Sequence, residues 1–200
     1  MNKEQFIGLA KKQSRVIIQL ESYIHDLKFF WSSKVEQKEF EAINLPQFKV
    51  ILDLVERHTI LLMNSLLSKS KGDKLRLEKI LNLLVNERKK VSGWGFNFDR
   101  NQLNAQLNSL TEFQNSTQIK NVRDSLIAHL DDKEVELIER KDILEIQIFL
   151  MEFENQILSK ITGLNHTYFS IFSIENHIKR FIQLIEIEKK YRALLDSTLD

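Results

Sequence analysis

Residues 46–67 read PQFKVILDLVERHTILLMNSLL. Apolar side chains recur in this stretch at spacings of three and four residues, which is the pattern of a helix with one buried stripe. Pro46 stands where a helix-opening proline belongs, because its missing N–H would have no intrahelical partner in the first turn. The stretch therefore predicts an amphipathic helix that begins at Pro46 and ends near Leu67.

The same spacing recurs along most of the chain. It predicts further helices over about 3–35, 74–90, 100–110, 117–130, 141–161 and 174–195, with Asp99 and Ser116 or Thr117 as caps and Gly163 as a stop. The chain has only five glycines and one proline, whereas a sandwich, a barrel or an α/β fold needs many more turn residues. We therefore expect an all-α protein, a single-domain antiparallel bundle of about six to seven helices over residues 1–200.

Composition and charge set the class of protein. Lysine and arginine total 29 against 28 aspartate and glutamate residues, so a net charge of +1 gives no general attraction to nucleic acid or to an anionic membrane. The longest apolar stretch, about 59–67, is interrupted and too short for a bilayer. Residues 1–5 are polar and charged and lead into no apolar signal segment. We expect a soluble cytoplasmic protein without a membrane partner.

Most catalytic templates are absent from the sequence. It has no glycine-rich phosphate loop, no HExxH, no EF-hand loop and no Gly-x-Ser-x-Gly elbow. It also has no cysteine, which excludes a disulfide framework, a thiolate metal site and a cysteine nucleophile. The five histidines show no ligand-like spacing among themselves. We therefore predict no metal and no cofactor, so any chemistry is built from side chains on helices.

One segment, residues 119–131, combines a basic residue and a histidine with a helical stripe. Its apolar residues are Ile119, Val122, Leu126 and Leu130. Arg123 and His129 fall on opposite borders of that stripe, about 9 Å apart along the helix axis. A histidine at such a border can move protons, and an arginine offers a permanent planar charge for phosphate. The pair suits metal-free phosphodiester cleavage.

A structural interpretation stands beside the catalytic one. His129 lies near the C-terminal end of its predicted helix, where a protonated histidine is stabilised by the helix dipole alone. Arg123 could pair with a carboxylate of a neighbouring helix. The spacing by itself does not separate these alternatives, because an arginine and a histidine fall at such a distance by chance in many chains.

The residues from Arg123 to His129, RDSLIAH, resemble the defining motif of the HEPN superfamily, an arginine with a polar follower and a histidine a few residues later. The wider context, with Ala128-His129-Leu130-Asp131, looks like the AbiU-type abortive-infection branch of that superfamily. Residues 60–67 and 75–81 are also similar to that branch. The resemblance covers about residues 15–165.

This resemblance implies a helical bundle that forms a homodimer and acts as a metal-independent endoribonuclease in a phage-defence or toxin–antitoxin system. Carried over to this chain, Arg123 would bind phosphate, His129 would act as acid or base, and Asp124 would orient the site. RNA would be the substrate, and an antitoxin would be a further partner. A non-catalytic HEPN-like module that binds nucleotide or a partner protein is the alternative, and a purely structural bundle is a third.

Several basic runs and one aromatic loop are further candidates for RNA contact. The runs are Arg88-Lys89-Lys90, Arg140-Lys141, and Lys189-Lys190 with Arg192. The loop, residues 92–97, holds Trp94 between Gly93 and Gly95, with Phe96 directly after Gly95. Such aromatic side chains can stack on bases, although a loop of this kind is more often pinned to its own core. Basic runs are likewise more often solvated helix faces.

Overall fold

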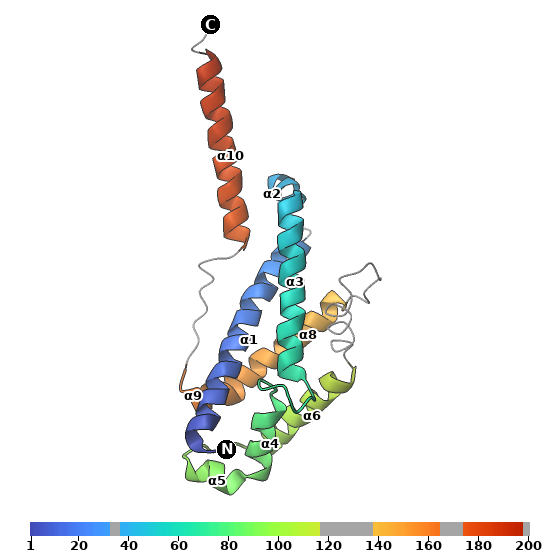
Figure 1. Cartoon of the computed structure of the whole chain (residues 1–200), viewed down its shortest axis with the longest axis vertical. Coiled ribbons are helices and arrows are strands. Elements are labelled where there is room, and N and C mark those ends of the chain that lie inside the picture. The colour runs from blue at the N-terminus through green and yellow to red at the C-terminus, as the bar shows by residue number, and fades with distance from the viewer. Residues whose placement is uncertain (33–36, 117–137, 165–173, 198–200) are drawn as a thin grey trace. The chain divides into compact units, whose positions relative to one another are not determined.

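The computed structural model describes residues 1–32, 37–116, 138–164 and 174–197. All the regular secondary structure of these residues is helical, which confirms the all-α prediction (Figure 1). The elements in chain order are α1 (Lys3–Trp31), α2 (Gln37–Ile43), α3 (Pro46–Leu67), α4 (Glu78–Asn86), α5 (Arg88–Gly93), α6 (Arg100–Ser116), α8 (Arg140–Phe153), the π-helix η1 (Glu154–Leu158), α9 (Ser159–Thr162) and α10 (Ile174–Ser197).

Contacts between residues divide the chain into two compact units. Unit 1 comprises residues 1–21 and 57–167, and unit 2 comprises residues 22–56 and 168–200. Helices α1 and α3 each contribute residues to both units. The assignment of residues 1–200 to one domain stays a prediction.

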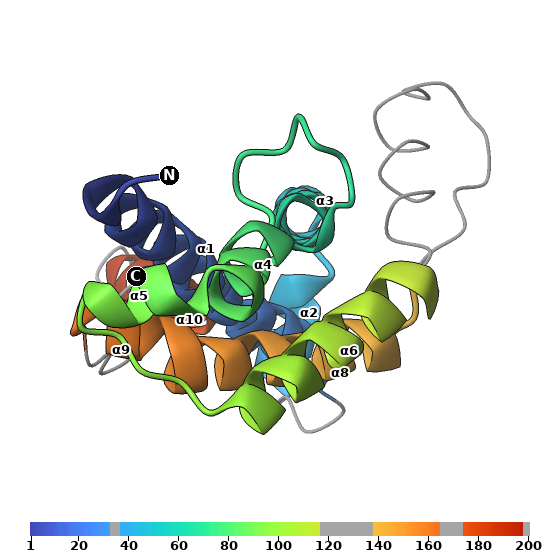
Figure 2. The ribbon, with the colours of Figure 1, turned by 90° about the horizontal axis from the view of Figure 1, so that it is seen from below.

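Unit 1 is built around apolar faces of its helices. Helix α4 buries Ile80, Leu81, Leu83 and Leu84, and α8 buries Ile143, Ile146, Phe149, Leu150 and Phe153. Helix α6 lies beside both α4 and α8, and Figure 2 shows its course along α8. The ring of Phe149 lies 5.1 Å from Phe113 of α6. Burial of such side chains is the main stabilising contribution to a helical bundle.

Several predicted helix boundaries are confirmed. Helix α3 has the predicted bounds, Pro46 to Leu67. The carboxylate of Asp99 accepts a hydrogen bond from the backbone N–H of Gln102 at 2.9 Å and caps α6, as predicted. The helical segment from α8 to α9 ends at Gly163, which has a φ of +67°. The predicted helix over 117–130 lies outside the described residues.

One predicted helix was wrong, and one helix was missed. The structure has two helices, α4 and α5, where a single helix was expected over 74–90. Helix α4 begins only at Glu78. The chain departs from helical geometry at Glu87, with φ −111° and ψ 36°, which separates α4 from α5. Residues 74–77 form turns, since tertiary partners bind their backbone. The side chain of Gln13 donates to the carbonyl oxygens of Leu75 and Arg76 at 3.0 and 2.9 Å, and Leu77 N–H donates to Leu66 O at 2.8 Å. The short helix α2 was not predicted.

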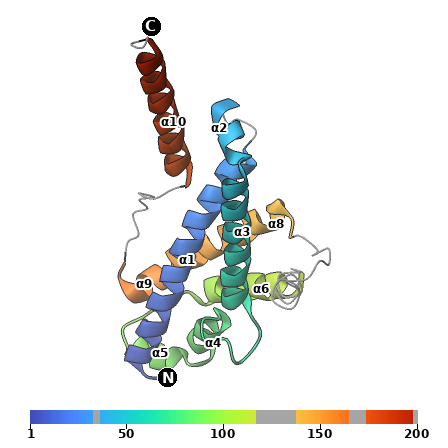
Figure 3. The same ribbon diagram turned by 45° about the horizontal axis from the view of Figure 1, so that its top comes forward.

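Unit 2 holds α10 against α2 and the adjoining parts of α1 and α3. Ala42, Phe48 and Ile178 are buried, and the rings of Phe48 and Phe181 lie 5.7 Å apart. Lys38 pairs with Glu186, and Lys179 Nζ lies 3.9 Å from Glu39 Oε1. Figure 3 shows α2 and α10 as neighbours.

The pairing of Lys38 with Glu186 depends on pH. The hydrogen bond from Lys38 lowers the pKa of the Glu186 carboxyl below its ordinary value. A carboxyl with a lowered pKa stabilises the folded state above its ordinary pKa, and this contribution is lost as the pH falls through the lowered value. The attachment of α10 to α2 therefore loses this contribution in acid.

Substitutions of two glycines, Gly8 and Gly163, should change stability in opposite directions. A Cβ built on Gly8, inside α1, meets no atom within 4 Å, so we expect Gly8→Ala to stabilise the protein by about 0.5–1 kcal/mol through helix propensity. Gly163 adopts a left-handed conformation, so we expect Gly163→Ala to cost roughly 1–2 kcal/mol. Chemical denaturation of both variants checks this, and a common direction of change would contradict it.

Candidate functional site

The residues of the predicted catalytic motif, Arg123, Asp124 and His129, lie outside the described residues. The described chain stops at Ser116, the last residue of α6, and resumes at residue 138, just before α8 begins at Arg140. The predicted roles of the three residues therefore stay predictions. The described residues show what surrounds this segment in the sequence and which other features could bind a ligand.

The basic run at 88–90 holds the protein's own loop. Arg88 donates a hydrogen bond to the carbonyl oxygen of Phe98 at 3.2 Å. Lys90 Nζ lies 2.5 Å from a carboxylate oxygen of Glu87 and 5.6 Å from the centre of the Trp94 ring. The hydrogen bond from Lys90 also lowers the pKa of the Glu87 carboxyl. Two of the three basic side chains thus have structural partners, which favours the structural interpretation of this run.

The aromatic loop at 92–97 is attached to the core, as the sequence indicated. Its anchor is Phe6 of α1, which is fully buried. The Phe6 ring lies 5.5 Å from the Trp94 ring and 5.9 Å from the Phe96 ring. Such tilted aromatic contacts are favourable beyond the area they bury. Both loop aromatics therefore serve primarily to hold the loop in place.

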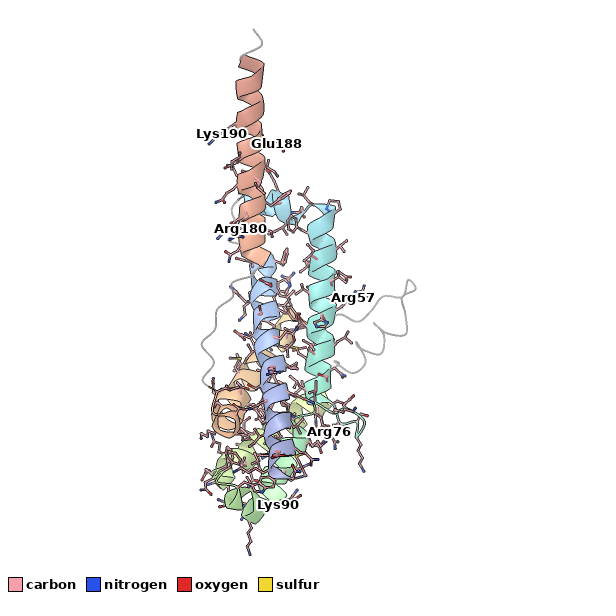
Figure 4. The ribbon with its side chains drawn as sticks, turned by 60° about the vertical axis from the view of Figure 1, so that its left-hand side comes forward. Arg57, Arg76, Lys90, Arg180, Glu188 and Lys190 are labelled. Carbon is pink, nitrogen blue, oxygen red and sulfur yellow. The ribbon has the colours of Figure 1, made fainter. Side chains whose placement is uncertain are left out.

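The lysines of the other basic runs, Lys141, Lys189 and Lys190, lie on exposed helix faces. Lys141, in the first turn of α8, is exposed and lies 3.7 Å from Glu145 one turn later. Lys189 and Lys190 are exposed on α10, and Figure 4 labels Lys190 there together with Arg180 and Glu188. An exposed ion pair such as that of Lys141 with Glu145 contributes little to stability. These side chains are consistent with solvated faces.

Sequence reasoning missed a set of buried polar side chains around the π-helix η1. Glu154, which opens η1, is almost fully buried, and its carboxylate accepts a hydrogen bond from Ser14 of α1 at 2.7 Å. Gln156 accepts hydrogen bonds from Gln102 and Gln106 of α6 at 2.9 and 3.1 Å. The sequence signal was available, since Ser14 and Glu154 fall on otherwise apolar stripes. Hydrogen-bonded groups of this kind fix which helix faces meet in unit 1.

Cavities open on the described residues in both units. One cavity, of about 620 Å³, lies in unit 1 and is lined by Met1, Gln5, Gly8, Leu9, Lys12, Lys74, Leu75 and Lys79. A smaller one of about 230 Å³, also in unit 1, is lined by Leu84, Val85, Arg88, Arg100 and Leu103. In unit 2 a cavity of about 430 Å³ lies between α2 and α10 and includes Lys38, Phe181 and Glu186 in its lining.

Within the described part of the chain, no group of three or more histidine, aspartate or glutamate side chains is placed to hold a metal ion. No helix formed by these residues has the length and apolar character needed to cross a membrane.

Comparison with known proteins gives no relative. No family model, no curated protein and no solved structure matches this chain. The functional assignment therefore depends on the residues of the chain itself.

Proposed function

We propose that the chain is a metal-independent endoribonuclease of a phage-defence or toxin–antitoxin system. The observation that carries the proposal is the motif from Arg123 to His129, with Asp124 as polar follower, in a chain whose described regular secondary structure is all helical. The helical fold class agrees with what the HEPN resemblance implies. The scarcity of glycine and the absence of cysteine also favour acid–base chemistry by helical side chains.

The proposed reaction is an internal transfer at the RNA phosphate. A base takes the proton of the 2′-hydroxyl, the 2′-oxygen forms a bond to the adjacent phosphorus, and the bond from phosphorus to the 5′-oxygen breaks. An acid gives a proton to the leaving 5′-oxygen, so the products are a 2′,3′-cyclic phosphate and a 5′-hydroxyl end. His129 moves a proton, and Arg123 stabilises the charge on the phosphate. Asp124 orients the site.

We also propose that the active protein is a homodimer, with Arg123 of one copy beside His129 of the other. Large apolar side chains remain exposed on unit 2, with Leu184 and Ile187 of α10 64% and 63% exposed. Val50 and Leu54 of α3 are exposed to a similar degree. Both pairs have helical spacing, so each lies on one side of its helix. Burial of exposed apolar residues is a common source of dimer stability.

A growth assay tests the function in a cell. We propose that the protein acts in the cytoplasm, where an antitoxin partner would restrain it. Expression of the wild-type chain alone should therefore arrest bacterial growth, because RNA cleavage removes transcripts. Expression of His129→Ala to the same level should permit growth. Equal toxicity of the two proteins would contradict the site, and equal growth with both would favour the non-catalytic binding module.

A further inference from the structure

The charged side chains that line the 620 Å³ cavity of unit 1 are all positive. Lys12 of α1, Lys74 of the turn before α4 and Lys79 of α4 line it, and no aspartate or glutamate does. Three lysines and no acidic residue give the lining a formal charge of +3, in a chain whose net charge is only +1. Several positive charges and no negative charge around one cavity make its potential positive, which attracts an anion.

The carboxylates nearest in sequence are engaged elsewhere. Asp73 accepts a hydrogen bond from the hydroxyl of Ser68. Glu78 pairs with Arg76 at 3.4 Å and accepts a hydrogen bond from Asn82 at 3.2 Å. Among the described residues, Lys12, Lys74 and Lys79 have no ion-pair partner. Their ammonium groups are therefore available to a ligand.

The cavity wall is held by buried contacts. Gln13 is fully buried beside Lys12 in the chain, and its side-chain amide donates to the carbonyl oxygens of both Leu75 and Arg76. These two hydrogen bonds fix the turn that carries Lys74 against α1. Lys79 lies in the first turn of α4, where the helix dipole favours an anion. The lysines are thus placed by the fold of unit 1.

The lining of the cavity leaves room for a ligand beside Gly8. Gly8 lines the cavity, and a Cβ built on Gly8 meets no atom within 4 Å. Leu9 and Leu75 add apolar side chains to the lining. The volume lies in the range of about 300–1,000 Å³ that is usual for small-molecule sites. Cationic groups beside apolar walls suit a ligand with several phosphates and an apolar or aromatic part.

We propose that this cavity binds a nucleoside polyphosphate, with Lys12, Lys74 and Lys79 on the phosphates and Leu9 and Leu75 beside the rest of the ligand. The site shares no residue with the Arg123–His129 motif, so it is independent of the ribonuclease proposal. A cavity with three lysines favours a small ligand over an RNA chain, because an RNA chain would need a continuous basic track.

Calorimetric titration of the full chain tests the site, with ATP, inorganic triphosphate, AMP and a 5′-hydroxyl RNA oligonucleotide as probes. We expect ATP and triphosphate to bind with Kd values below about 1 mM, and AMP to bind more weakly because it offers fewer charges. Raising the salt concentration should weaken binding several-fold. The proposal would be overturned if the RNA oligonucleotide binds through the same lysines and triphosphate does not bind.

Substitutions locate the site. Lys12→Gln, Lys74→Gln and Lys79→Gln should each raise the Kd for ATP by about threefold to tenfold, and the triple variant should show no binding. The matched control is Lys160→Gln, since Lys160 is an exposed lysine of unit 1 that does not line the cavity. It should leave the Kd unchanged. Equal Kd values for the wild type and the triple variant would overturn the proposal.

A substitution at Gly8 separates occupancy of the cavity from loss of charge or fold. Gly8→Leu keeps all three lysines and improves helix propensity, but it adds a bulky side chain to the cavity lining. We expect it to abolish ATP binding while the unfolding temperature does not fall. Unchanged binding would overturn the proposal. His129→Ala should bind ATP as the wild type does, so failure here and failure of the ribonuclease proposal are distinguishable.

Discussion

His129→Ala should lower the rate of RNA cleavage by about 10²- to 10⁴-fold, because it removes the group that moves a proton in the transition state. The measurement is single-turnover cleavage of an end-labelled RNA with a chelator present, since the proposed reaction needs no metal. Arg123→Ala should cause a loss of similar size through the lost stabilisation of phosphate charge. The wild type should yield 2′,3′-cyclic phosphate ends.

The control for this experiment is Lys160→Ala, which changes an exposed basic residue outside the motif and outside the basic runs considered for RNA contact. It should cleave at a rate close to that of the wild type. Circular dichroism and unfolding temperature of every variant exclude loss of fold as the cause. Cleavage that survives both motif substitutions would show that the site lies elsewhere.

Mixing the two inactive variants tests whether the site is shared between copies. If Arg123 of one copy acts with His129 of the other, a mixed dimer holds one site with both residues intact. Random exchange of subunits then restores about a quarter of the wild-type activity, since about half of the dimers are mixed and each has one of two sites. If both residues of a site come from one copy, mixing restores nothing.

Phe6→Ala should cost about 3–5 kcal/mol of stability, the largest effect that we expect from a single substitution in unit 1. Phe6 is fully buried, and its ring contacts those of Trp94 and Phe96. The substitution removes the core packing and both aromatic contacts, which releases the loop at 92–97. Denaturant unfolding measures the loss, and Trp94 fluorescence should shift to longer wavelength as the ring becomes hydrated.

The second tryptophan, Trp31, lies in unit 2 and donates to Glu56 at 3.2 Å, so the fluorescence is best measured in a Trp31→Phe background. Ile148→Ala is the matched control, because Ile148 lies on α8 of unit 1 and is 60% exposed. It should change stability by no more than about 0.5 kcal/mol. A Phe6→Ala protein as stable as this control would show that the loop does not depend on Phe6.

The sequence alone determined the fold class and several helix ends. Pro46 and Gly163 mark chain positions where a helix begins or ends whatever surrounds it, because a missing N–H and a left-handed φ are local properties. The scarcity of turn residues and the spacing of apolar residues by three and four can likewise be interpreted without knowing what each helix packs against. The motif at Arg123 and His129 is also a local pattern. It predicts a type of chemistry but not where the two side chains lie in the folded protein.

Tertiary structure decided what depends on distant partners. Residues 74–77 have helical periodicity, yet Gln13 binds their carbonyl oxygens from 62 and 63 positions away and keeps them in turns. The pairing of Ser14 with Glu154 spans 140 positions. The lysine-lined cavity arises in the same way, because α1 and the turn before α4 meet only in the folded protein. Sequence periodicity reports which side of a helix is buried, whereas the partner of that side is chosen by packing and hydrogen bonding over the whole unit.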